Sequence, residues 1–103
     1  MNGRYTPPPV YPSIRDYVSV VTKTDENVSV SNTNISRDVS IPKVEGYDLI
    51  GIIGYDCDNV NVRFYKMSYT IGSEDTDQIN YAVRATSSGT ANTTFYLMYF
   101  KTT

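Results

Sequence analysis

Apolar residues recur at every second position over much of this chain, which is the spacing of a β-strand with one buried face. Between residues 35 and 41, Ile35, Val39 and Ile41 alternate with serine and aspartate. The charged Arg37 belongs to the same series, so we expect this strand at an edge or rim of a sheet. No window shows the spacing of an amphipathic helix over three turns. The pattern predicts about seven strands, at residues 16–24, 28–31, 35–41, 46–55, 60–71, 79–85 and 92–101.

The most apolar stretch, residues 46–55, does not alternate, because apolar residues occupy both parities. In a regular strand, Leu49 and Ile53 would face one way, and Ile50 and Ile52 the other. A strand that is apolar on both faces needs cover on both faces. We therefore expect residues 46–55 to form the central strand around which the rest of the chain is organised.

Two irregularities are predicted inside strands. Gly51 and Gly54 indicate bends, or places where another backbone comes close. In the strand at 60–71, the apolar parity shifts at Tyr65. A parity shift within one strand is typical of a β-bulge or a sharp bend.

Short strands at regular spacing, separated by polar turns, are typical of sandwiches and barrels. We expect an antiparallel, jelly-roll-like β-sandwich over residues 16–103. Residues 1–15 precede it as a proline-rich, extended lead-in, since the prolines at 7–9 favour polyproline II. Such a segment is a linker, a proline-rich ligand for another protein module, or a lead-in that wraps against a neighbouring subunit.

A two-sheet sandwich buries only one face of each sheet, yet residues 49–53 and 95–100 are apolar on both parities. Either loops cover the outer faces of these strands or a second subunit does. We expect an oligomer, because aromatic residues and methionine are enriched at interface cores. The candidate interface residues are Ile50, Ile52, Tyr96, Met98 and Phe100.

Composition narrows the possible functions. The net charge is −2 and the nine basic residues are scattered singly, so we expect no nucleic-acid partner. No apolar run reaches the roughly 18 residues of a membrane-spanning helix, and the N-terminus does not resemble a signal peptide. The single Cys57 excludes an intrachain disulfide and suits assembly in a reducing cytoplasm. The chain has no histidine, which excludes His-dependent nucleophile systems and histidine-ligated zinc.

Carboxylates gather in two places, Asp56 and Asp58 on either side of Cys57, and the segment with Glu74, Asp75 and Asp77. Oxygen ligands from loops suit calcium, although the spacing does not match an EF-hand. Solvated acidic turns explain the same residues, and a pair of carboxylates could also serve a small hydrolase. We expect solvated turns, no enzyme activity and no cofactor.

Ten tyrosines are the remaining feature of the composition. Tyrosine on a strand often fills a core, but an exposed ring offers flat, amphipathic contact area to saccharides and proteins. The candidates at strand ends and loop edges are Tyr47, Tyr55 and Tyr69.

Four segments carry a resemblance to a known group of domains. They are GYDLIGIIGY at 46–55, VRFY at 62–65, YAVRATSS at 81–88 and FYLMYFK at 95–101. With its Gly-Tyr-x-x-Ile-Gly-Ile strand and its aromatic-aliphatic last strand, this part of the chain resembles the C-terminal domains of tail-tip and fibre proteins of phages and prophages of Gram-positive bacteria.

The resemblance covers roughly the last 55 to 60 residues. It implies a β-sandwich, often trimeric, that attaches to a bacterial surface saccharide or protein and is located in the virion. One departure is that those proteins usually carry a long N-terminal body, so this chain is expected to be a small standalone virion protein, such as a head fibre or decoration protein, or an excised domain. A bacterial carbohydrate-binding or adhesin-like module is the alternative.

Overall fold

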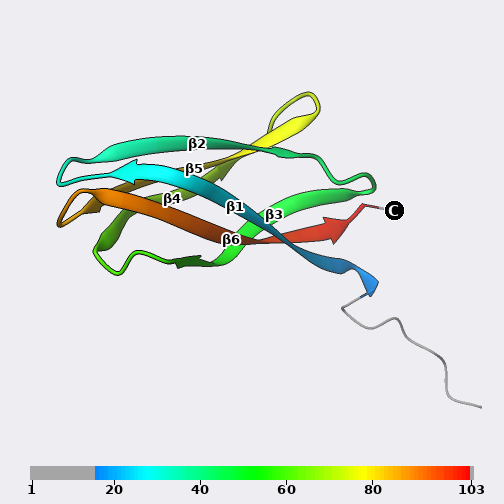
Figure 1. Cartoon of the computed structure of the whole chain (residues 1–103). Helices are drawn as coiled ribbons and strands as arrows, with labels where there is room; N and C mark the ends of the chain where they lie inside the picture. The colour runs from blue at the N-terminus through cyan, green and yellow to red at the C-terminus, as the bar shows by residue number, and fades with distance from the viewer. Residues whose placement is uncertain (1–15, 103) are drawn as a thin grey trace, which may run out of the picture.

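The computed structural model describes residues 16–102, which form six β-strands in an all-β fold (Figure 1). The expected lead-in at 1–15 lies outside the described residues. The strands are β1 Val18–Val30, β2 Ile35–Pro42, β3 Tyr47–Cys57, β4 Val62–Thr70, β5 Thr76–Ala85 and β6 Gly89–Lys101.

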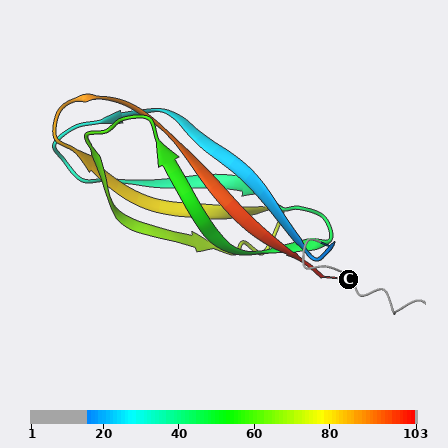
Figure 2. The same cartoon turned by 90° about the horizontal axis from the view of Figure 1, so that it is seen from below.

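The strands form two antiparallel sheets of three strands each. Sheet 1 has the order β1-β6-β3 and sheet 2 has the order β2-β5-β4. Figure 2 shows the strands of sheet 1 lying side by side over those of sheet 2. Along the chain, β4 and β5 are joined within one sheet, whereas every other pair of consecutive strands crosses from one sheet to the other.

The core lies between the sheets and depends most on their central strands. Along β5 and β6, buried residues alternate with partly exposed ones, as expected for strands with one face on the core. The buried apolar residues come from all six strands: Val28, Val30, Val39, Ile41, Leu49, Val62, Ile79, Tyr81, Val83, Ala85, Ala91, Phe95, Leu97 and Tyr99.

Six strands are present rather than seven, because the predicted strands at 16–24 and 28–31 are one strand, β1. The predicted turn between them is a β-bulge, where the pairing with β6 shifts between Asp25 and Val28. Asn27, within the bulge, has a φ of 56°, a left-handed conformation that asparagine tolerates better than most residues. The turn-forming residues at 25–27 therefore mark a bulge within β1 and not the end of a strand.

The prediction that residues 46–55 form a central strand is wrong. This segment is β3, which lies at the edge of sheet 1, and β6 takes the centre. Two bulges, between Leu49 and Gly51 and between Ile52 and Gly54, change its parity twice. As a result Leu49 and Ile52 pack on the core, whereas Ile50 and Ile53 are exposed. The bulges explain why both parities of the sequence are apolar.

The predicted parity shift at Tyr65 is confirmed. β4 has a register shift between Phe64 and Lys66 in its pairing with β5, so Tyr65 is the extra residue of a bulge. β2 lies at the edge of sheet 2 and ends at Pro42, in agreement with the expectation from Arg37.

Candidate functional site

The outer face of sheet 2 is polar. At its centre, Asn80 Nδ2 donates to Asp38 Oδ1 at 2.7 Å, and Thr70 Oγ1 donates to Asn80 Oδ1 at 2.6 Å. These hydrogen bonds connect β2, β5 and β4, and they give the side chains of Asp38, Asn80 and Thr70 hydrogen-bond partners within the sheet. The outward positions are Ser36, Asp38, Ser40, Lys66, Ser68, Thr70, Gln78, Asn80, Ala82 and Arg84.

The outer face of sheet 1 is different. Val20 and Phe100 are 53% and 45% exposed, and the ring of Tyr17 stacks on that of Phe100 with centroids 6.2 Å apart. Its charged members, Asp48 and Asp56, lie toward the two ends of β3. The outward positions are Val18, Val20, Thr22, Thr24, Asp48, Gly51, Gly54, Asp56, Thr94, Tyr96, Met98 and Phe100.

The predicted interface residues divide between this outer face and other parts of the sandwich. Tyr96, Met98 and Phe100 alternate with the buried residues of β6, so they face outward. Ile50 is exposed but lines the larger hollow on the β3–β4 side, and Ile52 packs against the core. The structure therefore brings three of the five residues to the outer face of sheet 1, and the other two lie elsewhere.

The three candidate tyrosines lie on β3 and β4, the strands that border one open side of the sandwich. Tyr69 Oη donates to the Ile50 carbonyl oxygen at 2.9 Å and so links the two sheets across this side. Farther along, the ring of Tyr55 contacts that of Phe64, with centroids 4.4 Å apart. Tyr47 is partly buried and packs against the core, so its ring contributes to the packing of the sandwich.

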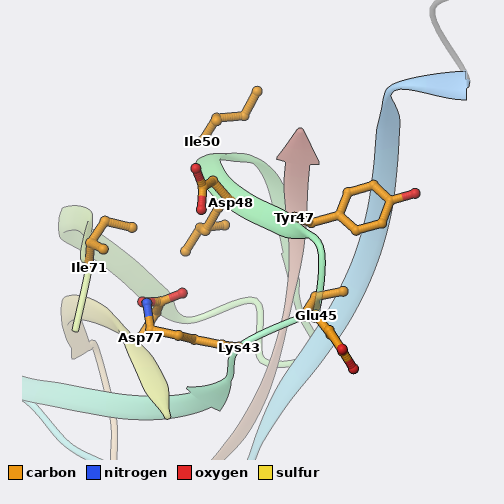
Figure 3. Close-up of a pocket in the computed structure, with 9 residues that line it drawn as sticks. Lys43, Glu45, Tyr47, Asp48, Ile50, Ile71 and Asp77 are labelled. Carbon is orange, nitrogen blue, oxygen red and sulfur yellow. The ribbon is translucent and has the colours of Figure 1, made fainter. Parts of the chain in front are cut away.

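Two hollows flank the Tyr69–Ile50 link. The larger, of about 500 Å³, lies between the start of β3 and the loop that follows β4, and Figure 3 shows Ile50, Asp48 and Ile71 around it. The side chains of Tyr47 and Glu45 point away from Ile71. The smaller hollow, of about 380 Å³, is lined by Gly51, Ile52, Met67, Ser68 and Tyr69.

Asp77 lies at the base of the larger hollow, where Lys43 and Gly72 engage its carboxylate. Its side chain is 3% exposed, and its Oδ1 accepts hydrogen bonds from Lys43 Nζ at 2.7 Å and from the Gly72 backbone N–H at 3.0 Å. The carboxylate thus holds the β4–β5 loop and the end of β2 together. Burial, together with the charge of Asp77, raises the pKa of Tyr99.

The predicted acidic residues do not come together. Glu74 and Asp75 are exposed in the β4–β5 loop, whereas Asp56 and Asp58 lie near the β3–β4 loop at the other end of the sandwich (Figure 1). Within residues 16–102, no group of three or more acidic or cysteine side chains is placed to hold a metal ion.

Asp56 and Asp58 are each engaged by a residue of β6. Asp58 accepts hydrogen bonds from the side chain and backbone N–H of Asn92, at 2.7 and 2.8 Å, and these lower its pKa. Asp56 accepts a hydrogen bond from Tyr96 Oη at 2.8 Å, which raises the pKa of that tyrosine. These carboxylates therefore position the end of β3 against β6.

A polar cluster that joins the two sheets was not predicted; its Asp25 and Tyr81 are buried, and the Arg37 side chain is 41% exposed. Asp25, in the bulge of β1, accepts two hydrogen bonds from the Arg37 guanidinium, at 2.8 and 2.9 Å, and one from Tyr81 Oη at 2.6 Å. Burial alone would raise the pKa of Asp25, but the hydrogen bonds outweigh it and lower that pKa. Burial and Asp25 raise the pKa of Tyr81. The one feature of the sequence that could have indicated this cluster is Arg37, a charged residue at a position where the alternating pattern of the strand calls for an apolar one.

Comparison of the chain with protein-family models, with curated proteins and with solved structures found no match in any of the three. Within residues 16–102, the structure contains no helix with the length and apolar character needed to cross a membrane. The functional argument therefore depends on two surfaces, the apolar outer face of sheet 1 and the tyrosine-bearing side between β3 and β4.

Proposed function

We propose that this chain is a non-enzymatic structural protein of a phage or prophage virion, of the tail-tip, fibre or head-fibre and decoration kind. It self-associates, with a trimer favoured, and binds a saccharide or protein on a bacterial surface. The observation that carries the proposal is the apolar outer face of sheet 1, because an exposed apolar patch on a small domain marks an interaction surface. The resemblance of residues 46–101 to phage tail domains supplies the biological setting.

The proposal includes a jelly-roll-like sandwich. A full jelly roll has eight strands in two sheets. Residues 16–102 have six, but all consecutive strands except β4 and β5 cross between the sheets, and β1 lies beside β6 and β2 beside β5, as in a rolled ribbon. Virion localisation follows from the proposed function, and residues 1–15 are a candidate contact to other virion proteins.

The ligand-binding part of the proposal depends on the β3–β4 side. Tyr69 is 36% exposed and lines the smaller hollow, and Tyr55, on the same side of the sandwich, is 45% exposed with its ring against Phe64. Aromatic rings beside a hollow suit the apolar faces of sugar rings and also protein side chains. A bacterial carbohydrate-binding or adhesin-like module would use the same surface, and such a module is expected to be a monomer.

Binding to purified Gram-positive cell walls tests this part. Tyr55→Ala and Tyr69→Ala should each weaken binding of the labelled protein by about tenfold, the effect of about 1.4 kcal/mol. Ser40→Ala is the control, because Ser40 lies on the polar outer face of sheet 2, on the edge strand opposite β4. Loss of binding after periodate treatment of the walls indicates a saccharide, and loss after protease treatment indicates a protein. Absence of binding to every wall preparation contradicts the proposal.

A further inference from the structure

The larger hollow on the β3–β4 side has apolar walls that remain open to a ligand. Leu49, Ile50 and Ile71 line it, and Ile50 and Ile71 are 41% and 54% exposed. Its volume of about 500 Å³ lies within the range of small-molecule sites in proteins. A ligand in this hollow would therefore find apolar surface on both β3 and the segment that follows β4.

Four charged residues line the same hollow, and two of them neutralise each other. Lys43 Nζ lies 2.7 Å from Asp77 Oδ1, so this ammonium group already has its counter-charge. The other two are Glu45 and Asp48, which make the lining negative. The Glu45 side chain points away from Ile71 (Figure 3), which leaves the Asp48 carboxylate as the charge beside the apolar walls.

Asp48 has no partner among the described residues. Its side chain is exposed, and within residues 16–102 no hydrogen bond or ion pair engages its carboxylate. Asp48 lies opposite Phe100 in the pairing of β3 with β6 and also lines the hollow, so its carboxylate stands at the rim. A free carboxylate next to apolar walls is complementary to a cation that has apolar surface of its own.

A metal ion fits this hollow less well than an organic cation. Hard cations such as calcium need several oxygen ligands. Here the Asp77 carboxylate is engaged by Lys43, and the Ile50 carbonyl oxygen accepts a hydrogen bond from Tyr69. An organic cation needs a single counter-charge, and its carbon skeleton can use the apolar walls.

We propose that the larger hollow binds an amino sugar with a free amine, whose ammonium group pairs with Asp48 while its ring lies against Ile50 and Ile71. The inference rests on the proposed attachment to a bacterial surface and names the ligand class of that site. A sugar ring suits the hollow better than a narrow lysine side chain, because the ring offers a flat apolar face and the charge on one rigid unit. An N-acetylated sugar lacks the charge and should bind more weakly.

Isothermal titration calorimetry with two oligosaccharides of equal length tests this preference. One consists of glucosamine and the other of N-acetylglucosamine, so they differ only in the free amine. At about pH 5.5, free amines are protonated and exposed carboxylates are ionised. We expect the wild-type chain to bind the glucosamine form at least about tenfold more tightly, the effect of about 1.4 kcal/mol.

Asp48→Asn removes the charge and keeps the shape of the side chain, so it should abolish the preference for glucosamine. Glu26→Gln is the matched control, because Glu26 is exposed in the bulge of β1, lies outside the hollow, and its replacement removes the same charge. This variant should keep the preference. Both should unfold thermally like the wild type, since both side chains are exposed.

Equal affinity for the two oligosaccharides, or binding of neither, overturns the inference. A preference that survives in Asp48→Asn, or that is lost equally in Glu26→Gln, overturns it as well. N-acetylation of purified cell walls with acetic anhydride separates this inference from the proposed function. Wall binding that survives acetylation unchanged overturns the amino-sugar ligand and leaves attachment to the surface standing. Absence of binding to every untreated wall, with the preference for glucosamine intact, contradicts the surface attachment alone.

Discussion

The two sheets of this sandwich have similar inner faces and opposite outer faces. Sheet 2 covers its outer face with a hydrogen-bonded network centred on Asn80, which needs no partner molecule. Sheet 1 exposes Val20 and Phe100. Both faces belong to one fold, and the proposed self-association would account for the difference, with sheet 2 facing water and sheet 1 facing another copy.

The largest expected effect concerns the ion pair that joins the sheets. Asp25→Ala should lower the free energy of unfolding by about 2–4 kcal/mol, because it leaves the Arg37 guanidinium and the Tyr81 hydroxyl without their shared acceptor. Asp38→Ala, on the exposed outer face of sheet 2, should cost less than about 1 kcal/mol. Urea denaturation measures both. Equal losses would show that the buried pair contributes no more than a surface hydrogen bond.

The same pair predicts a dependence on pH. The pKa of Asp25 is lower in the folded chain than in the unfolded one, so the unfolded chain takes up the proton first as the pH falls. Its stabilisation is complete above about pH 4 and is lost as the pH falls through the folded pKa. The stability difference between wild type and Asp25→Asn should therefore shrink below pH 4 in urea titrations. A difference that stays constant from pH 7 to pH 2.5 would contradict the proposed role of the carboxylate.

A third prediction compares a glycine of each sheet. At Gly72, in the β4–β5 loop of sheet 2, an added Cβ would collide with the Thr76 carbonyl oxygen. Gly72→Ala should therefore cost about 1–3 kcal/mol. At Gly51, in β3 of sheet 1, an added Cβ would meet no atom within 4 Å, so Gly51→Ala should be neutral or stabilise the strand by up to about 1 kcal/mol. Thermal unfolding at a concentration where the chain is monomeric separates the two. The reverse order would mean that Gly51 is needed for the fold itself.

The smallest effect is expected on the polar face. Asn80→Ala removes the residue that joins Asp38 and Thr70, and should cost about 0.5–1.5 kcal/mol. Ser40→Ala, on the same face, is the control and should stay within about 0.5 kcal/mol. Neither change should alter association in sedimentation experiments. A shift in the oligomeric state of either variant would indicate that sheet 2 also takes part in assembly.

The strands that the sequence predicted best are the central ones. β5 and β6 keep a strict two-residue period because each pairs on both sides and packs one face on the core. The bulge at Tyr65 was also predictable, since it shifts an otherwise regular pattern once. β3 was misassigned because two bulges in quick succession look the same in sequence as an apolar strand covered on both faces.

The functional surfaces were only partly predictable. Parity placed Tyr96, Met98 and Phe100 on one face, but the same counting put Ile52 beside them, and the bulge turns it inward. The partnership of Asp25 with Tyr81 spans 56 positions and depends on how the sheets stack, which no local pattern encodes.

The central claim is that the outer face of sheet 1 contacts another copy of the chain. Light scattering of the wild-type protein over a wide concentration range tests it most directly. We expect a mass of two or three chains that persists on dilution into the low micromolar range. A mass of one chain at the highest concentration would contradict the claim, and the apolar face of sheet 1 would then have to serve a different partner.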